Sequence, residues 1–139
     1  MRTKHRSLIG ITLLTIITLG LYQIYWYFIT KTEMNTVNGK AVKVPFFLWF
    51  FIPIINIWWF WRFAKAIEKT TKNTVNRWAA FLAPVVLGFV GGAFLGILYP
   101  SFFQADMVYQ TTFLGSLLVI IVSLLPIYYF QSNLNKFAR

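Results

Sequence analysis

The chain has 139 residues, of which 58% are hydrophobic, 20% aromatic and 12% charged, and its formal net charge is +10. A soluble domain carries about 25% charged residues, so this composition excludes an ordinary water-soluble fold and predicts one unit in a lipid bilayer. The absence of cysteine excludes disulfides, thiolate chemistry and cysteine-ligated metals.

Four apolar segments predict four transmembrane helices, at residues 8–29, 45–61, 79–100 and 110–130. Each is close to the ~20 residues that cross ~30 Å of hydrocarbon. The first ends in bulky aromatic residues without a small-x-small cleavage site, so we interpret it as a retained helix rather than a signal peptide. The second is short and contains Pro53, which allows either a kink or a re-entrant segment. The predicted fold is all-α, a polytopic membrane helical bundle in a single domain, residues 1–139.

The distribution of Lys and Arg predicts a multi-pass protein of the cytoplasmic membrane with both termini inside, because cations near short loops are held on that side. Three cations then lie outside, namely Lys31, Lys40 and Lys43. The other ten lie inside: Arg2, Lys4, Arg6, Arg62, Lys65, Lys69, Lys72, Arg77, Lys136 and Arg139. This count changes if the second segment is re-entrant. The cations lie between apolar blocks, so we expect anionic lipid, and no nucleic acid, as the acidic partner.

The ends of the first two segments share a pattern at a shift of 33 residues, which places Gly20 on Pro53 and Trp26 on Trp59. Internal repeats with broken helices mark transport sites in some carriers. Two unrelated aromatic helix ends would give the same short match.

Two amides lie within these segments, Gln23 and Asn56. An amide in lipid must find a hydrogen-bond partner, so we interpret both as intramembrane polar contacts, either to a neighbouring helix or to a ligand.

The stretch from residue 62 to residue 78 predicts an amphipathic cytoplasmic segment, with Phe63, Ile67, Thr71, Val75 and Trp78 at helical spacing. Such a segment lies in the membrane interface with its cations among anionic headgroups, each worth about 1 kcal/mol. The predicted lipid contacts are Arg62, Lys65, Lys69, Lys72 and Arg77.

The third segment contains Gly88, Gly92 and Gly96 at a four-residue spacing, which predicts a helix-packing face. The partner helix belongs either to this chain or to a second copy.

Chemical groups within the membrane are scarce. No Asp, Glu, His, Lys or Arg lies well inside a predicted span, and the three acids, Glu33, Glu68 and Asp106, fall in separate loops. An ion-coupled antiporter needs a titratable intramembrane group, so that class is disfavoured. We predict no catalytic, cofactor-binding or metal-binding residue, and no enzyme activity.

Three motifs occur in order: ITLGLYQIYW at residues 17–26, IPIINIWW at 52–59 and QSNLN at 131–135. In these the chain resembles a family of small prokaryotic integral membrane proteins classed as a domain of unknown function. The resemblance covers most of the chain, except the region between the third and fourth segments, and implies a prokaryotic membrane location without a catalytic residue.

Three functional hypotheses follow. The first is a non-catalytic subunit or scaffold that binds a second copy or another membrane protein. The second is a small passive channel or carrier, and the third is an anionic-lipid-binding protein.

Overall fold

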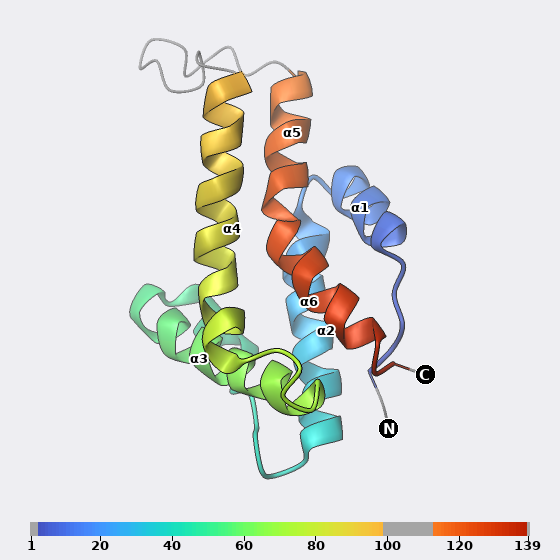
Figure 1. Cartoon of the computed structure of the whole chain (residues 1–139), viewed down its shortest axis with the longest axis vertical. Helices are drawn as coiled ribbons and strands as arrows, with labels where there is room; N and C mark the ends of the chain where they lie inside the picture. Colours follow the sequence, from blue (N-terminus) through green and yellow to red (C-terminus); the bar gives the residue numbers. More distant parts are fainter. Residues whose placement is uncertain (1–2, 99–112, 139) are drawn as a thin grey trace.

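A computed structural model of the protein describes residues 3–98 and 113–138, and this part of the chain is all-α without a strand, as predicted (Figure 1). Its elements are α1 (Leu8–Ile17), α2 (Leu21–Asn38), a 3-10 helix η1 (Phe47–Phe51), α3 (Pro53–Thr70), α4 (Arg77–Leu98), α5 (Phe113–Ser123) and α6 (Leu125–Asn135).

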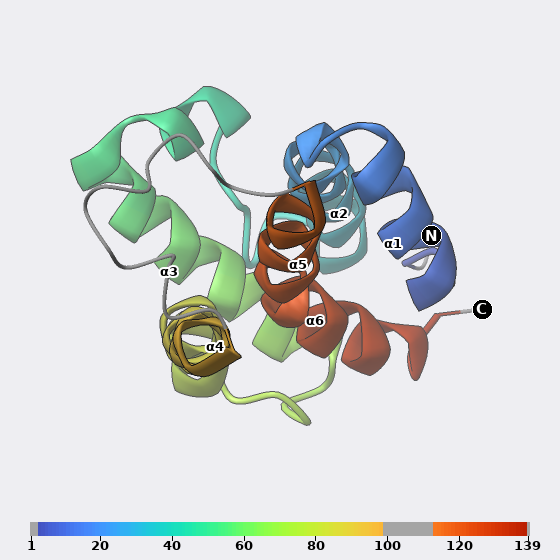
Figure 2. The ribbon, with the colours of Figure 1, turned by 90° about the horizontal axis from the view of Figure 1, so that it is seen from above.

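The helices form a wide end and a narrow end. We call the wide end the base; it comprises residues 3–7, 26–46, 59–78 and 130–138, and α3 crosses it below α4 (Figure 1). The narrow end consists of the upright pair α4 and α5, which we call the hairpin. Seen from above, α3 and α1 extend to opposite sides of this pair (Figure 2).

Two helices are long and apolar enough to cross a membrane: α4, and the α5–α6 pair taken as Gly115–Asn135. Only 17% and 33% of their apolar windows are buried within the protein, so neither is the core helix of a soluble fold. A helix of 22 residues spans about 33 Å, enough for the hydrocarbon layer. These two helices suggest a membrane protein; four spans are not seen.

The prediction of one helix over residues 8–29 is wrong. Leu19 and Gly20 both have positive φ, 50° and 95°, which ends α1 and starts α2 in a new direction. Glycine adopts this left-handed conformation without steric cost. The amide of Gly20 donates to the carbonyl of Thr15 at 2.8 Å, so the break leaves no orphan donor there. In Figure 1, α1 leads away from the base and α2 returns to it.

The second predicted span, residues 45–61, is also not one helix. Ile52 is extended, with φ −96° and ψ 114°, between η1 and α3. Pro53 explains this, because proline disfavours helical backbone in the residue before it and starts a helix well itself.

The predicted amphipathic segment 62–78 is not a separate interfacial helix. It is the second half of α3, a turn and the start of α4. Its predicted apolar face is buried at Phe63, Ile67, Thr71 and Val75, whereas Trp78 is exposed. That face packs into the protein core rather than into the membrane interface.

The last two predicted segments match helices with shifted bounds. The third, residues 79–100, corresponds to α4, and its last two residues lie outside the described residues. The fourth, residues 110–130, is divided into α5 and α6 at Leu124, just before Pro126.

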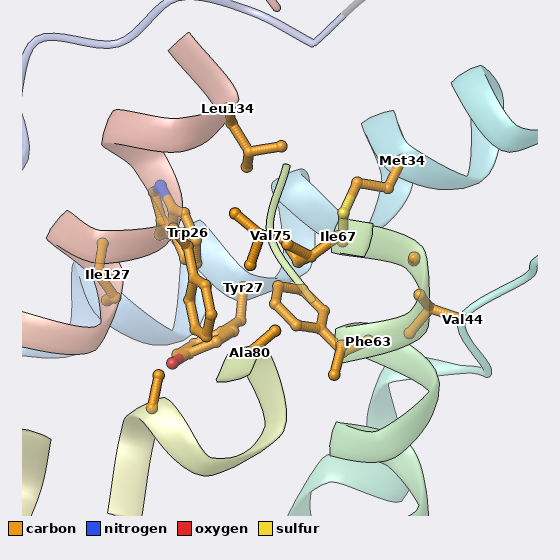
Figure 3. Packing of buried hydrophobic residues seen from close by; sticks show 14 of the residues in the cluster. Trp26, Tyr27, Met34, Val44, Phe63, Ile67, Val75, Ala80, Ile127 and Leu134 are labelled. Carbon is orange, nitrogen blue, oxygen red and sulfur yellow. The ribbon is translucent and has the colours of Figure 1, made fainter. Parts of the chain in front are cut away.

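The core lies where α2, α3 and α6 meet (Figure 3). Trp26, Trp59, Phe63 and Phe130 are fully buried. The rings of Trp59 and Phe63 stack with centroids 5.3 Å apart, and those of Trp26 and Phe130 stack at 6.5 Å. Aromatic packing of this kind adds to area burial and fixes the three helices together.

Candidate functional site

A chain of hydrogen bonds joins α2, α6 and the N-terminal segment inside the base. The indole Nε1 of Trp26 donates to Oε1 of the fully buried Gln131 at 2.8 Å, and Nε2 of Gln131 donates to Oδ1 of Asn135 at 2.6 Å. Asn135 in turn donates from Nδ2 to the carbonyl of Arg6 at 2.8 Å and accepts from the amide of Arg6 at 3.1 Å. Buried polar groups paired in this way specify one arrangement of the helices.

An ion pair also joins the N-terminal segment to α2. The guanidinium of Arg6 contacts the carboxylate of Glu33 on α2, and both side chains are largely shielded from solvent. The other carboxylate oxygen of Glu33 accepts from the amide of Lys4 at 3.1 Å. The start of α1 is therefore held against the lower part of α2.

The end of α2 and the segment after it are held against α3. Nδ2 of Asn38, the last residue of α2, donates to the carbonyl of Ala66 at 3.2 Å and to Oγ1 of Thr70 at 3.0 Å. The guanidinium of Arg62 donates to the carbonyl of Lys43, with the shorter contact at 2.8 Å.

These contacts bear on the predicted sides of the membrane. Lys31, Lys40 and Lys43 were expected on the opposite side from Arg6 and Arg62. In the structure their segment is bonded to the N-terminal segment and to α3, so it lies at the same end of the protein. Straight helices over residues 8–29 and 45–61 would have placed it at the other end, whereas the breaks at Gly20 and Ile52 turn the chain back.

The two predicted intramembrane amides have different partners. Nε2 of Gln23 donates to Oγ of Ser123 at 2.7 Å and thus links α2 to α5. Asn56 donates to the carbonyl of Phe50, a local contact that bridges η1 and α3. Both amides thus have a hydrogen-bond partner within the described part of the chain.

The glycine of α4 that packs within the chain is Gly91, which the four-residue spacing missed. A Cβ on Gly91 would lie 2.2 Å from Cγ1 of Val122 on α5. A Cβ on Gly88 or Gly92 would meet nothing within 4 Å, so these two glycines face away from the rest of the described chain. Gly96, the third predicted glycine, is half-buried.

The five cations predicted to contact lipid divide into two groups. Arg62 is held by the Lys43 carbonyl, and Arg77 pairs with Glu68 at 3.2 Å. Lys65 is half-buried, and Lys69 and Lys72 are exposed at the base.

Lys31, one of the cations reassigned to the base, has a lowered pKa. Partial burial is the larger cause and the neighbouring Lys43 charge the smaller one.

No group of three His, Cys, Asp or Glu side chains that could hold a metal ion occurs within residues 3–98 and 113–138. The prominent feature is instead the polar base, whose key pair, Trp26 and Gln131, was missed by sequence reasoning. The sequence did contain an indication of this pair, because Trp26 and Gln131 both belong to the motifs on which the family resemblance rests.

Residues 6–69 match a family described as Domain of unknown function (DUF4234). The match includes α1, α2, η1 and nearly all of α3, and it excludes the hairpin and α6. It is shorter than the expected resemblance, which included residues 131–135. No curated protein and no solved structure matches the chain.

Proposed function

We propose that this protein is a two-span, non-catalytic subunit or scaffold of the cytoplasmic membrane, with its base on the cytoplasmic side. The two spans are α4 and the α5–α6 pair. The base contains both ends of the described chain, residues 3 and 138, so both ends are cytoplasmic in this arrangement, as predicted from charge.

The observation that carries the proposal is the one-sided placement of charge. None of the thirteen Lys and Arg residues lies between residues 78 and 135, and Asp106 is the only charged residue in that stretch. Contacts of Glu33, Asn38 and Arg62 keep the remaining loop cations at the base. The distribution becomes thirteen cations inside and none outside, a stronger bias than ten against three.

Two segments are assigned to one leaflet instead of to full spans. The residues that α1 and the start of α3 expose are strongly apolar, including Ile17 at 75% and Ile54 at 84% exposure. Large exposed apolar surface of this kind is stable in lipid and not in water. With 10 residues, α1 is about 15 Å long and reaches the middle of the hydrocarbon layer. We infer that α1 and the η1–α3 junction dip into the cytoplasmic leaflet and return.

The scaffold role is supported by the surface of α4. α5 covers Gly91, whereas Gly88, Gly92 and the neighbouring Phe89, which is 78% exposed, have no cover within the described chain. A helix face with little side-chain bulk allows close approach of another helix in lipid. We propose that this face receives a second copy or another membrane protein.

Intact-complex mass spectrometry of the protein in nanodiscs, prepared from its native membrane, tests this role. The proposal expects a homo-oligomer or a stoichiometric protein partner, with complex formation lost in Gly92→Leu. A monomer without a partner, in wild type and variant alike, would contradict it.

The second hypothesis, a passive channel or carrier, draws on the repeat. α2 and α3 both have 18 residues and both follow a short helix and a break. Trp26 and Trp59, equivalent in the proposed repeat, are both fully buried. The repeat stays a prediction, and solute flux into liposomes that contain the purified protein tests the transport function. Flux equal to that of empty liposomes would exclude it.

A further inference from the structure

A cavity of about 360 Å³ opens in the base where the ends of α2 and α3 meet both ends of the described chain. Its lining includes Thr3, Val37, Thr70, Lys72, Lys136 and Phe137. These residues come from the N-terminal segment, α2, α3 and its following turn, and the segment after α6. The cavity therefore exists only because the base brings distant parts of the chain together.

The charge of this cavity is one-sided. Two lysines line it, Lys72 and Lys136, and no Asp or Glu is among its described lining residues. The two acids of the described chain are engaged elsewhere, Glu33 with Arg6 and Glu68 with Arg77. Lys136 contacts only an amide oxygen, Oδ1 of Asn133, at 3.2 Å. Within residues 3–98 and 113–138, both positive charges are thus without a counter-charge, which favours an anion in the cavity.

A second, independent observation indicates a ligand. Thr3 is 2% exposed, and its hydroxyl Oγ1 is buried without a hydrogen-bond partner. The other threonine of the lining is satisfied, because Thr70 donates to the Ala66 carbonyl at 2.8 Å and accepts from Asn38. Buried hydroxyls are costly to leave unpaired. The hydroxyl of Thr3 is enclosed, so it would donate to an anion's oxygen after its side chain turns toward the cavity that Thr3 lines.

The backbone directs Lys72 to this place. Lys72 and Asn73 have φ of 51° and 65°, in the left-handed region that non-glycine residues rarely adopt. This turn ends α3 and stops Lys72 from continuing along the helix axis. The amide of Asn73 bonds back to the Glu68 carbonyl at 2.8 Å, which holds the turn in place.

We propose that this cavity binds a phosphate group through the ammonium groups of Lys72 and Lys136 and the hydroxyl of Thr3. A phosphate offers several acceptor oxygens and negative charge, which match two lysines and a threonine that line one cavity from three separate segments. Its source is either the headgroup of an anionic phospholipid or free inorganic phosphate. Only the lipid source depends on the proposed placement of the base at the cytoplasmic leaflet.

The lipid source is tested with the full chain in phosphatidylcholine nanodiscs with and without phosphatidylglycerol, by counting retained phosphatidylglycerol in intact-complex mass spectra. Lys72→Gln with Lys136→Gln is expected to weaken retention about thirtyfold, from about fivefold per lysine. The matched control, Lys40→Gln with Lys43→Gln, removes the same charge at exposed positions outside the cavity and should change retention much less.

The free-phosphate source is tested by titrating inorganic phosphate into the phosphatidylcholine nanodiscs and following the amide resonances of Thr3 and Lys72. Saturable shifts in wild type that the cavity double variant loses would identify free phosphate as the ligand. Retention of phosphatidylglycerol without such shifts would identify the lipid.

Thr3→Val tests the third donor without changing charge, with Thr3→Ser as the variant that should restore binding. The proposal expects Thr3→Val to weaken binding several-fold while the thermal midpoint without ligand stays at the wild-type value or rises. The proposal is overturned if neither probe distinguishes the cavity double variant from its matched control.

Discussion

The base and the hairpin are stabilised in different ways. The base contains fully buried aromatic rings and long-range hydrogen bonds, such as that between Trp26 and Gln131. The hairpin packs closely at Gly91 and exposes large side chains such as Phe89 and Ile97. The base is thus specified by contacts within the chain, whereas the hairpin relies on lipid or a partner for most of its surface. Substitutions should therefore affect folding in the base and assembly in the hairpin.

The largest difference in the loss of stability is expected between substitutions of two adjacent tryptophans of α3. Trp59 is fully buried against Phe50 and Phe63, whereas Trp58 is 52% exposed. Trp59→Ala should lower the free energy of unfolding by about 3–5 kcal/mol, because it leaves a cavity in the core. Thermal unfolding in detergent measures this, with Trp58→Ala as the control. Equal losses would mean that the base has no distinct core.

The second largest difference in stability is expected between substitutions of two adjacent glycines of α4. Gly91→Leu should destabilise the fold by about 1–3 kcal/mol, because even a Cβ there collides with Val122. Gly92→Leu should leave the thermal midpoint of the isolated chain unchanged, since nothing lies within 4 Å. The hairpin assignment would be wrong if Gly92→Leu unfolded the monomer as strongly as Gly91→Leu.

A smaller effect is expected from the buried amide. Gln131→Leu removes the acceptor of the Trp26 indole and the donor to Asn135. The unpaired partners should cost about 2 kcal/mol of stability. Gln23→Leu is the matched control, because its bond to Ser123 is exposed. Unfolding midpoints of the two variants that coincide would contradict the role given to the buried network.

The smallest effect concerns the ion pairs. A double-mutant cycle on Arg6 and Glu33 should give a coupling of about 1 kcal/mol, because both side chains are largely shielded. The cycle on Glu68 and Arg77 should give less, since the Arg77 side chain is 41% exposed. The reverse order would show that Arg6 does not hold α1 at the base.

Periodicity identified the residues of one buried face. The spacing of Phe63, Ile67 and Val75 identified a face that is indeed buried. It could not tell whether that face meets lipid or protein, because both environments select apolar residues.

The breaks were harder to predict than the helices. Leu19 and Gly20 lie in an apolar run whose hydropathy continues across them, so that run could not indicate the left-handed turn. The side of residues 30–46 depends on contacts between distant residues, such as Arg6 with Glu33, which a count of cations per loop does not include.

The site residues were predicted less well, for a related reason. A four-residue spacing favoured Gly88, Gly92 and Gly96, whereas the close contact with α5 is at Gly91, because the direction of α5 decides which face of α4 it meets. The cavity lined by Lys72 and Lys136 involves residues that are far apart in the chain. A local sequence pattern cannot predict that such residues lie close together.

The central claim is that residues 30–46 lie on the same side of the membrane as both ends of the chain. Because the chain has no cysteine, single-cysteine variants Lys40→Cys and Asp106→Cys can be labelled cleanly with a membrane-impermeant maleimide. In intact cells we expect labelling at position 106 only, with position 40 labelled after permeabilisation. Labelling of position 40 in intact cells would contradict the one-sided base and restore the four-span arrangement.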